Sequence, residues 1–161
     1  MLDPGVTSFV LESLPSPPAR ILEVGAGDGE RDAALAGLAA MLRPGGALVL
    51  DVRHWLRSVE RYADGRTVER SAAAPDGSSV ELRSTTHVDR DNRHLVSIER
   101  VAVGVGEVAH EMRMRPWGEG ELDRGLRAAG FDAIEYPPPA EAGARADRIV
   151  AVATRGAASA A

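Results

Sequence analysis

A glycine-rich loop between a predicted strand and a predicted helix is the part of the sequence best suited to chemistry. Residues 20–24 form a short apolar run, and GAGDG at residues 25–29 comes directly after it. Apolar periodicity predicts a helix over residues 31–42, with a buried stripe of Leu35, Leu38, Met41 and Leu42. Glycines let a backbone approach a ligand closely, and a helix N-terminus offers free N–H groups. The loop therefore predicts a cofactor site, with a tight turn that binds nothing as the alternative.

The charge and spacing of this loop favour a cofactor without phosphate. A dinucleotide fingerprint runs G-x-G-x-x-G, whereas Glu30 stands where its third glycine would be. Asp28, Glu30 and Asp32 crowd the predicted helix start, where they suit the helix dipole and would repel a pyrophosphate. A cofactor carrying a sulfonium and an ammonium group would not be repelled. An NAD-linked oxidoreductase is therefore disfavoured.

Separated segments, covering about half of the chain, resemble class I S-adenosylmethionine-dependent methyltransferases. Residues 23–29 (EVGAGDG) are similar to the family's first motif, an acidic residue followed by x-G-x-G-x-G, and residues 42–51 (LRPGGALVLD) resemble its fifth strand and the turn before it. Residues 117–131 resemble its last helix and the entry to strand six, and residues 148–154 its seventh strand. The resemblance implies methyl transfer to a small-molecule acceptor. It also implies S-adenosyl-L-methionine as the cofactor, held by Glu23, Gly25, Ala26, Gly27 and Gly29.

The same resemblance implies an α/β fold with a truncated Rossmann-like methyltransferase sheet. Between its first motif and the L-R-P-G-G turn the family has strands two, three and four, whereas this sequence has room there for about one helix. The family's ribose-binding acid ends strand two, so it has no counterpart here. We therefore expect a dissociation constant for S-adenosylmethionine no tighter than roughly 100 µM, about −5.5 kcal/mol. Two alternatives to a methyltransferase with a naturally shortened sheet remain. The chain could be a non-catalytic binding or dimerisation module, or the missing strands could reflect a deletion in the gene sequence.

Asp51 lies near the end of a second apolar strand, predicted at residues 47–52. Two parallel strands need a crossover of about a dozen residues or more. Residues 20–24 and 47–52 are therefore predicted to be parallel neighbours, with helix 31–42 as their crossover. Asp51 then comes after the loop at about the 20-residue spacing of a ribose-binding acid. It is predicted either to replace the missing ribose ligand or only to end the strand and cap the next segment of chain.

The residues directly after Asp51 are candidates for a substrate pocket, because open α/β sheets bind ligands at the carboxyl edge of their strands. They are Arg53, His54 and Trp55. His54 is predicted to be either a base or hydrogen-bond partner of the substrate, or an ordinary surface residue. The sequence shows no catalytic triad and no histidines at metal-ligand spacing. Methyl transfer does not require either, because a sulfonium is already activated and positioning can supply most of the rate.

An antiparallel meander is predicted as an insertion at residues 64–115, within a single domain whose core is residues 1–63 and 116–155. Its four segments alternate polar and apolar residues, with hairpin turn residues between them, at 67–71, 79–88, 95–103 and 107–115.

A helix and two strands are predicted after the meander. Leu122, Leu126 and Ala129 share one face of the helix, and Gly130 stands at its C-cap. Residues 131–136 and 148–154 are predicted to be strands that pair antiparallel with each other.

The composition limits the classes of partner. The 161 residues are 44% hydrophobic and 27% charged, as in a soluble globular domain. A net charge of −5 argues against nucleic acid or an anionic membrane as the partner. The absence of cysteine excludes disulfides and thiolate chemistry, and no apolar run has transmembrane length, so we expect a cytoplasmic protein. Loss of the central strands would expose a sheet edge and apolar surface, and we therefore expect a homodimer.

Overall fold

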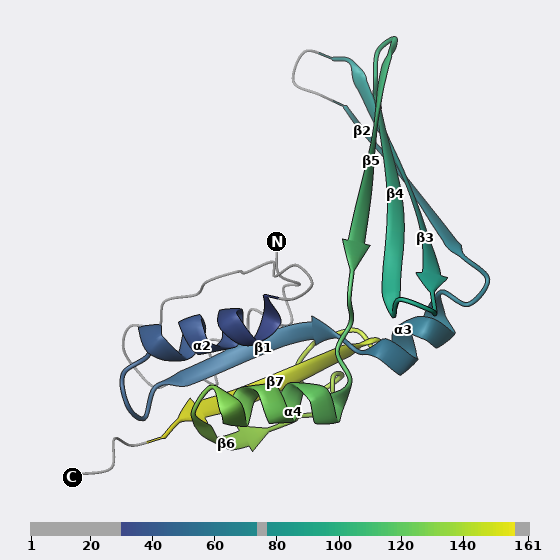
Figure 1. Ribbon diagram of the computed structural model, residues 1–161. Helices are drawn as coiled ribbons and strands as arrows, with labels where there is room; N and C mark the ends of the chain where they lie inside the picture. The colour runs from purple at the N-terminus through teal and green to yellow at the C-terminus, as the bar shows by residue number, and fades with distance from the viewer. Residues whose placement is uncertain (1–29, 74–76, 157–161) are drawn as a thin grey trace. The chain divides into compact units, whose positions relative to one another are not determined.

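The computed structural model describes residues 30–73 and 77–156 (Figure 1). The chain divides into two compact units, the first made of residues 1–57 and 117–161 and the second of residues 58–116. Helix α3 (Trp55–Arg61) spans the first boundary. For that reason the second unit begins earlier than residue 64, where the sequence places the start of the insertion.

A three-stranded sheet organises the first unit, in the order β1-β7-β6 (Figure 1). Strands β1 (Ala47–Arg53) and β6 (Phe131–Glu135) both pair antiparallel with β7 (Arg148–Arg155), which lies between them. The predicted antiparallel pairing of the last two strands is confirmed. The predicted parallel neighbour of β1, residues 20–24, lies outside the described residues. β1 itself is half-buried along its whole length, where its apolar sequence predicts a fully buried strand.

Helices α2 (Arg31–Met41) and α4 (Glu119–Ala128) pack on one face of this sheet. Their buried residues recur every four positions, as expected when a helix buries one stripe. They meet alternate residues of β1 and β7, because successive side chains of a strand point to opposite faces. The shared core comprises Leu35, Ala39, Leu122, Leu126, Phe131, Ile149, Ala151 and Ala153.

The buried stripe of α2 differs from the predicted one. Leu35 is buried and Leu42 packs on the core as predicted, but Leu38 is only half-buried and Met41 is 65% exposed. Ala39 is buried instead. With 3.6 residues per turn, residue 39 lies about 40° around the helix from Leu35, whereas residue 41 lies about 120° away. The prediction for Met41 is wrong because it rests on the apolar character of the residue. Its position on the helix points away from the buried stripe.

The apolar face of α4 and its C-terminal cap agree with the sequence pattern. Leu122 and Leu126 are fully buried, and Gly130 comes after the helix with a φ of +93°, a conformation that favours glycine. At the other end, the backbone N–H of Gly118 donates to Glu121 Oε2 over 3.3 Å. Gly125 lets α4 approach α2 closely, since a Cβ there would lie 2.9 Å from Leu35 Cδ1.

A four-stranded antiparallel meander organises the second unit, in the order β2-β3-β4-β5, as predicted (Figure 1). Its strands are β2 (Arg66–Ala73), β3 (Ser79–Asp89), β4 (His94–Val103) and β5 (Gly106–Met114). Neighbouring strands pair antiparallel throughout, and Gly104 between β4 and β5 has a φ of +59°. Alternation of side chains across strands this long divides the meander into two faces of different chemistry.

The register assigns each residue of the meander to one face. The apolar meander face carries Val68, Val80, Leu82, Val101, Val103 and Val108, together with Arg70, Glu99 and His110. The charged meander face carries Glu69, Arg83, Arg100, Glu107, Glu111 and Arg113. On the apolar face the side chains of Val103 and Val108 are 47% and 71% exposed. A single sheet layer leaves such a face without the second layer that usually covers it.

Candidate functional site

The predicted site falls partly within the described residues. Glu23, Gly25, Ala26, Gly27 and Gly29 lie outside them. The other predicted residues lie at the carboxyl end of β1, which ends at Arg53 rather than at Val52. His54 comes after the strand and Trp55 begins α3. The structure therefore describes the edge of the sheet at which the sequence predicts a ligand site.

Trp117 connects the start of α2 with this edge. Its backbone N–H donates to the Arg53 carbonyl over 2.8 Å, and its carbonyl accepts from the Trp55 N–H over 2.8 Å. The Arg31 guanidinium carbon lies 3.2 Å from the centre of the Trp117 ring, a cation–π contact, and Arg31 Nη1 lies 3.0 Å from Glu121 Oε1. Arg31 is the second residue after the glycine loop. The start of α2 and the predicted pocket residues thus meet at Trp117.

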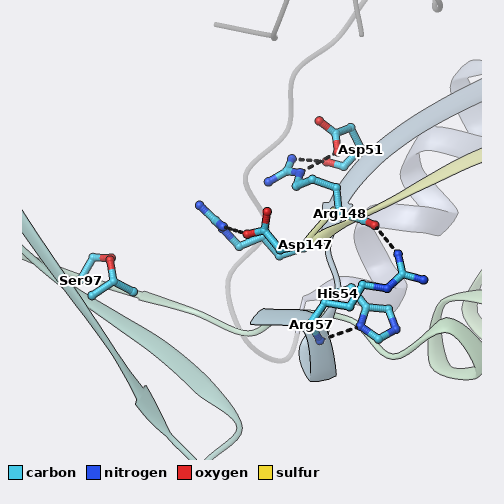
Figure 2. Close-up of polar contacts among 8 residues, drawn as sticks. Asp51, His54, Arg57, Ser97, Asp147 and Arg148 are labelled. Carbon is cyan, nitrogen blue, oxygen red and sulfur yellow. Dashed lines mark hydrogen bonds and ion pairs between the residues drawn. The ribbon is translucent and has the colours of Figure 1, made fainter. Parts of the chain in front are cut away.

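Asp51 is held by an arginine of the neighbouring strand. Arg148 Nε donates to Asp51 Oδ1 over 2.6 Å, and Arg148 Nη2 donates to the Asp51 carbonyl over 2.8 Å (Figure 2). The two side chains are 11% and 25% exposed, so the pair is largely removed from water. Asp51 does not cap the segment after the strand, because its carboxylate is directed to β7. It also points away from α2 and α4, since its neighbours Leu50 and Val52 pack on their side.

Further charges surround this pair in a carboxyl-end cluster. Asp147, of which the side chain is only 3% exposed, accepts from Arg53 Nη1 over 2.9 Å. Arg57 donates to the Arg148 carbonyl over 3.1 Å and to Glu119 Oε1 over 3.1 Å. The cluster comprises Asp51, Arg53, His54, Arg57, Glu119, Asp147 and Arg148. Each acidic group in the cluster lies against a basic one, so the cluster is suited to fixing the positions of the strand and helix ends at this edge of the sheet.

His54 acts as the N-cap of α3. Its Nδ1 accepts the backbone N–H of Arg57 over 3.1 Å (Figure 2). Its Nε2 lies 3.6 Å from Glu119 Oε1. Because Nδ1 is the acceptor, the proton of neutral His54 is assigned to Nε2. The residue is 8% exposed, and burial lowers its pKa below 6.5; Arg57 lowers the pKa further and Glu119 opposes this. In this arrangement neither nitrogen of neutral His54 is placed to take a proton from a substrate, which argues against its predicted role as a base.

The lowered pKa of His54 predicts a pH-dependent stability. The unfolded chain binds this proton more readily than the folded chain, so the free energy of unfolding should rise with pH across the range just below 6.5 and fall on acidification. Asparagine is a good N-cap and does not titrate. We expect His54→Asn to retain the cap and to weaken this pH dependence. Urea unfolding at about pH 5.5 and 7.5, followed by tryptophan fluorescence, measures the difference. Identical pH dependence in the two proteins would exclude His54 as its source.

Sequence reasoning missed most of the carboxyl-end cluster. Glu119, Asp147 and Arg148 come about 65 to 95 residues after β1 and reach it only through the β1–β7 pairing and the start of α4. The sequence identifies Trp117 only as the start of a helical segment. Within the described part of the chain, no three His, Asp or Glu residues group as metal ligands. No described helix is long and apolar enough to cross a membrane.

Comparisons with known proteins identify the fold. The sequence matches no protein-family model and no curated protein. Among solved structures, it matches DesVI from Streptomyces venezuelae with 21% identity and a TM-score of 0.59, over 79% of this chain and 51% of that one. It also matches CalS10 from Micromonospora echinaspora, an amino pentose methyltransferase solved with bound S-adenosylmethionine, with 26% identity and a TM-score of 0.54, over 77% of this chain and 50% of that one.

A third match has much lower sequence identity. An S-adenosylmethionine-dependent methyltransferase from Clostridium acetobutylicum shares 10% identity with this chain, with a TM-score of 0.55 over 78% of this chain and 50% of that one. The chain thus spans about half the length of the solved chains it matches. It has a mixed α/β fold with antiparallel sheets, similar to that of S-adenosylmethionine-dependent methyltransferases and truncated relative to those solved chains.

Proposed function

We propose that this chain binds S-adenosyl-L-methionine and supports methyl transfer to a small-molecule acceptor. The observation that carries the proposal is the match in fold to CalS10, which was solved with that cofactor and acts on an amino pentose. The glycine loop adds independent support, because its acidic residues suit a cofactor without phosphate. We propose the cytoplasm as the location, in keeping with a sequence without cysteine.

In this proposal the backbone of the glycine loop faces the methionine part of the cofactor. Gly25, Ala26, Gly27 and Gly29 supply the close approach, and Glu23 is the acidic residue that opens the motif. The start of α2 would lie next to the bound cofactor, and through Trp117 it contacts the segment of Arg53, His54 and Trp55. These three residues are therefore proposed to line the acceptor pocket.

Asp51 is proposed as the substitute ribose ligand, with one restriction that the structure adds. Its Oδ1 already accepts from Arg148, so ribose hydroxyls would have to donate to Oδ2. A carboxylate has about four lone-pair positions, so both partners can be accommodated. We expect Asp51→Ala to weaken binding about tenfold, near 1.4 kcal/mol. Micromolar binding that is unchanged by this substitution would show that the ribose is held elsewhere.

Calorimetric titration with S-adenosylhomocysteine tests the proposal. We expect a dissociation constant no tighter than roughly 100 µM, because strands two to four of the family, which would complete the pocket, are proposed to be absent. No heat of binding up to about 10 mM would remove the cofactor proposal. A parallel titration with NAD separates methyl transfer from the oxidoreductase alternative.

A non-catalytic dimerisation module is the second candidate, and the apolar meander face favours it. Leu82, Val101 and Val108 lie side by side across β3, β4 and β5, and Val103 continues the patch. Exposed apolar patches of this kind mark interaction surfaces. A two-fold axis would bring the same face of two copies together, which would give each sheet its second layer. We propose a homodimer formed through this face, with or without catalysis.

The homodimer proposal predicts a specific sensitivity to charge. Val108→Glu would place a carboxylate inside the buried interface and is expected to give a monomer. Val105→Glu is the matched control, because Val105 is fully exposed in the turn between β4 and β5 and belongs to neither face. Light scattering at tens of micromolar protein measures the mass. A monomeric native chain, or equal dissociation by both substitutions, would contradict the proposal.

A further inference from the structure

Two arginines stand directly opposite each other in the middle of the charged meander face. Arg83 of β3 and Arg100 of β4 are register partners, so their Cβ atoms are separated by about 5 Å. Like charges in this position destabilise a sheet unless something compensates them. Glu69 on β2 is the register partner of Arg83, whereas Ala109 lies opposite Arg100 on β5 and Glu107 pairs with Arg100 diagonally. The two central strands, β3 and β4, therefore present positive charge at this point of the face.

The flanking carboxylates engage only part of each guanidinium group. Glu69 Oε1 lies 3.4 Å from Arg83 Nε, and Glu107 Oε1 lies 2.8 Å from Arg100 Nη1. Among the described residues, neither terminal nitrogen of Arg83 and neither Nε nor Nη2 of Arg100 takes part in a hydrogen bond or ion pair. All four side chains are at least half exposed, and exposed ion pairs contribute little to stability. A second anion can therefore bind the remaining donors without breaking a strong interaction.

The two arginines line a hollow. It has a volume of about 290 Å³, and its other lining residues are Thr85 and Ile98, which are the next register pair on the same face. Thr85 Oγ1 hydrogen-bonds with Thr67 Oγ1 over 3.0 Å, and Ile98 is 36% exposed. The hollow thus combines a pair of guanidinium groups with an apolar wall. Glu111, the register partner of Ile98 on β5, is itself paired with Arg113 over 2.9 Å.

We propose that this hollow binds a small organic oxyanion, a phosphate monoester or a carboxylate, that carries an apolar group. The guanidinium planes match the paired oxygens of phosphate and carboxylate, and two of them side by side can share one anion. Ile98 contacts the apolar part of the ligand. Bound anion also removes the repulsion between Arg83 and Arg100. The site lies wholly within the meander and does not depend on the glycine loop.

Titration of the full ¹⁵N-labelled chain with phenyl phosphate and, separately, with benzoate tests the site. The amide signals of Thr85 and Ile98 are expected to shift at low ionic strength, with a dissociation constant of about 1 mM. High salt should weaken binding, because the contacts are exposed and ionic. Whichever probe binds more tightly identifies phosphate or carboxylate as the natural group.

Arginine variants distinguish the site from general surface charge. The double substitution Arg83→Gln and Arg100→Gln is expected to weaken binding at least tenfold, and each single substitution about threefold. The matched control is Arg113→Gln, which removes one charge from the same face outside the hollow and should change binding less than about twofold. No shift at Thr85 and Ile98 up to about 20 mM, or equal weakening by the control, would overturn the proposal. The single variants keep the test decisive if the double variant fails to fold.

Discussion

Replacing Gly27 by valine is expected to abolish the binding of S-adenosylhomocysteine. Gly27 stands at the centre of the glycine loop. In the proposed site the backbone approaches the ligand closely there, and any Cβ would occupy that space. A branched side chain should weaken binding at least about 100-fold, near 2.7 kcal/mol. Starting from a dissociation constant of roughly 100 µM, binding would then fall beyond the range of calorimetry.

The control for this substitution is a glycine outside the loop. Gly37 is exposed on α2, and a Cβ there would meet nothing within 4 Å. Gly37→Val makes the same chemical change and should leave the dissociation constant within about twofold. Retained binding in Gly27→Val would mean that the loop is only a tight turn between strand and helix.

Replacing Leu126 by alanine is expected to lower the free energy of unfolding of the first unit by about 2–5 kcal/mol. Leu126 is fully buried in the shared core of α2, α4 and the sheet, so the substitution removes apolar contacts and leaves a cavity. Both tryptophans, Trp55 and Trp117, belong to the first unit. Urea unfolding followed by tryptophan fluorescence therefore reports on this unit.

Leu56 provides the matched control for Leu126. It is also a helical leucine, but its side chain is 68% exposed. Leu56→Ala should change the free energy of unfolding by no more than about 0.5 kcal/mol. Equal loss of stability in the two variants would show that burial in this core is not what stabilises the unit.

Most of the secondary structure was predictable because these elements have local signatures, whereas the short helix α3 (Trp55–Arg61) was not predicted. The four meander strands alternate polar and apolar residues between turn residues, and α4 has a regular apolar stripe that ends before Gly130. Periodicity of this kind depends only on neighbouring residues. The prediction was wrong at Met41, where apolar character and helical position disagree. Position decided which residue was buried.

The carboxyl-end cluster was not predictable in the same way. The sequence indicated that Asp51, Arg53 and His54 lie at a sheet edge, but it did not indicate their partners. Arg148 meets Asp51 because β7 pairs with β1 across nearly a hundred residues of chain. That register is a tertiary property, and no local pattern encodes it. The same contacts altered the interpretation of His54 from a candidate base to the cap of α3.

The paired backbone hydrogen bonds around Trp117 have an evolutionary consequence. The chain leaves the first unit after Arg57 and returns at Trp117, and the Arg53–Trp117 and Trp55–Trp117 bonds hold the exit and the return side by side. A segment inserted between two points already fixed together adds little strain to the host, and longer loops cost only slowly increasing entropy. The meander can therefore lengthen, change its surface or acquire a new ligand while the β1-β7-β6 sheet keeps its register.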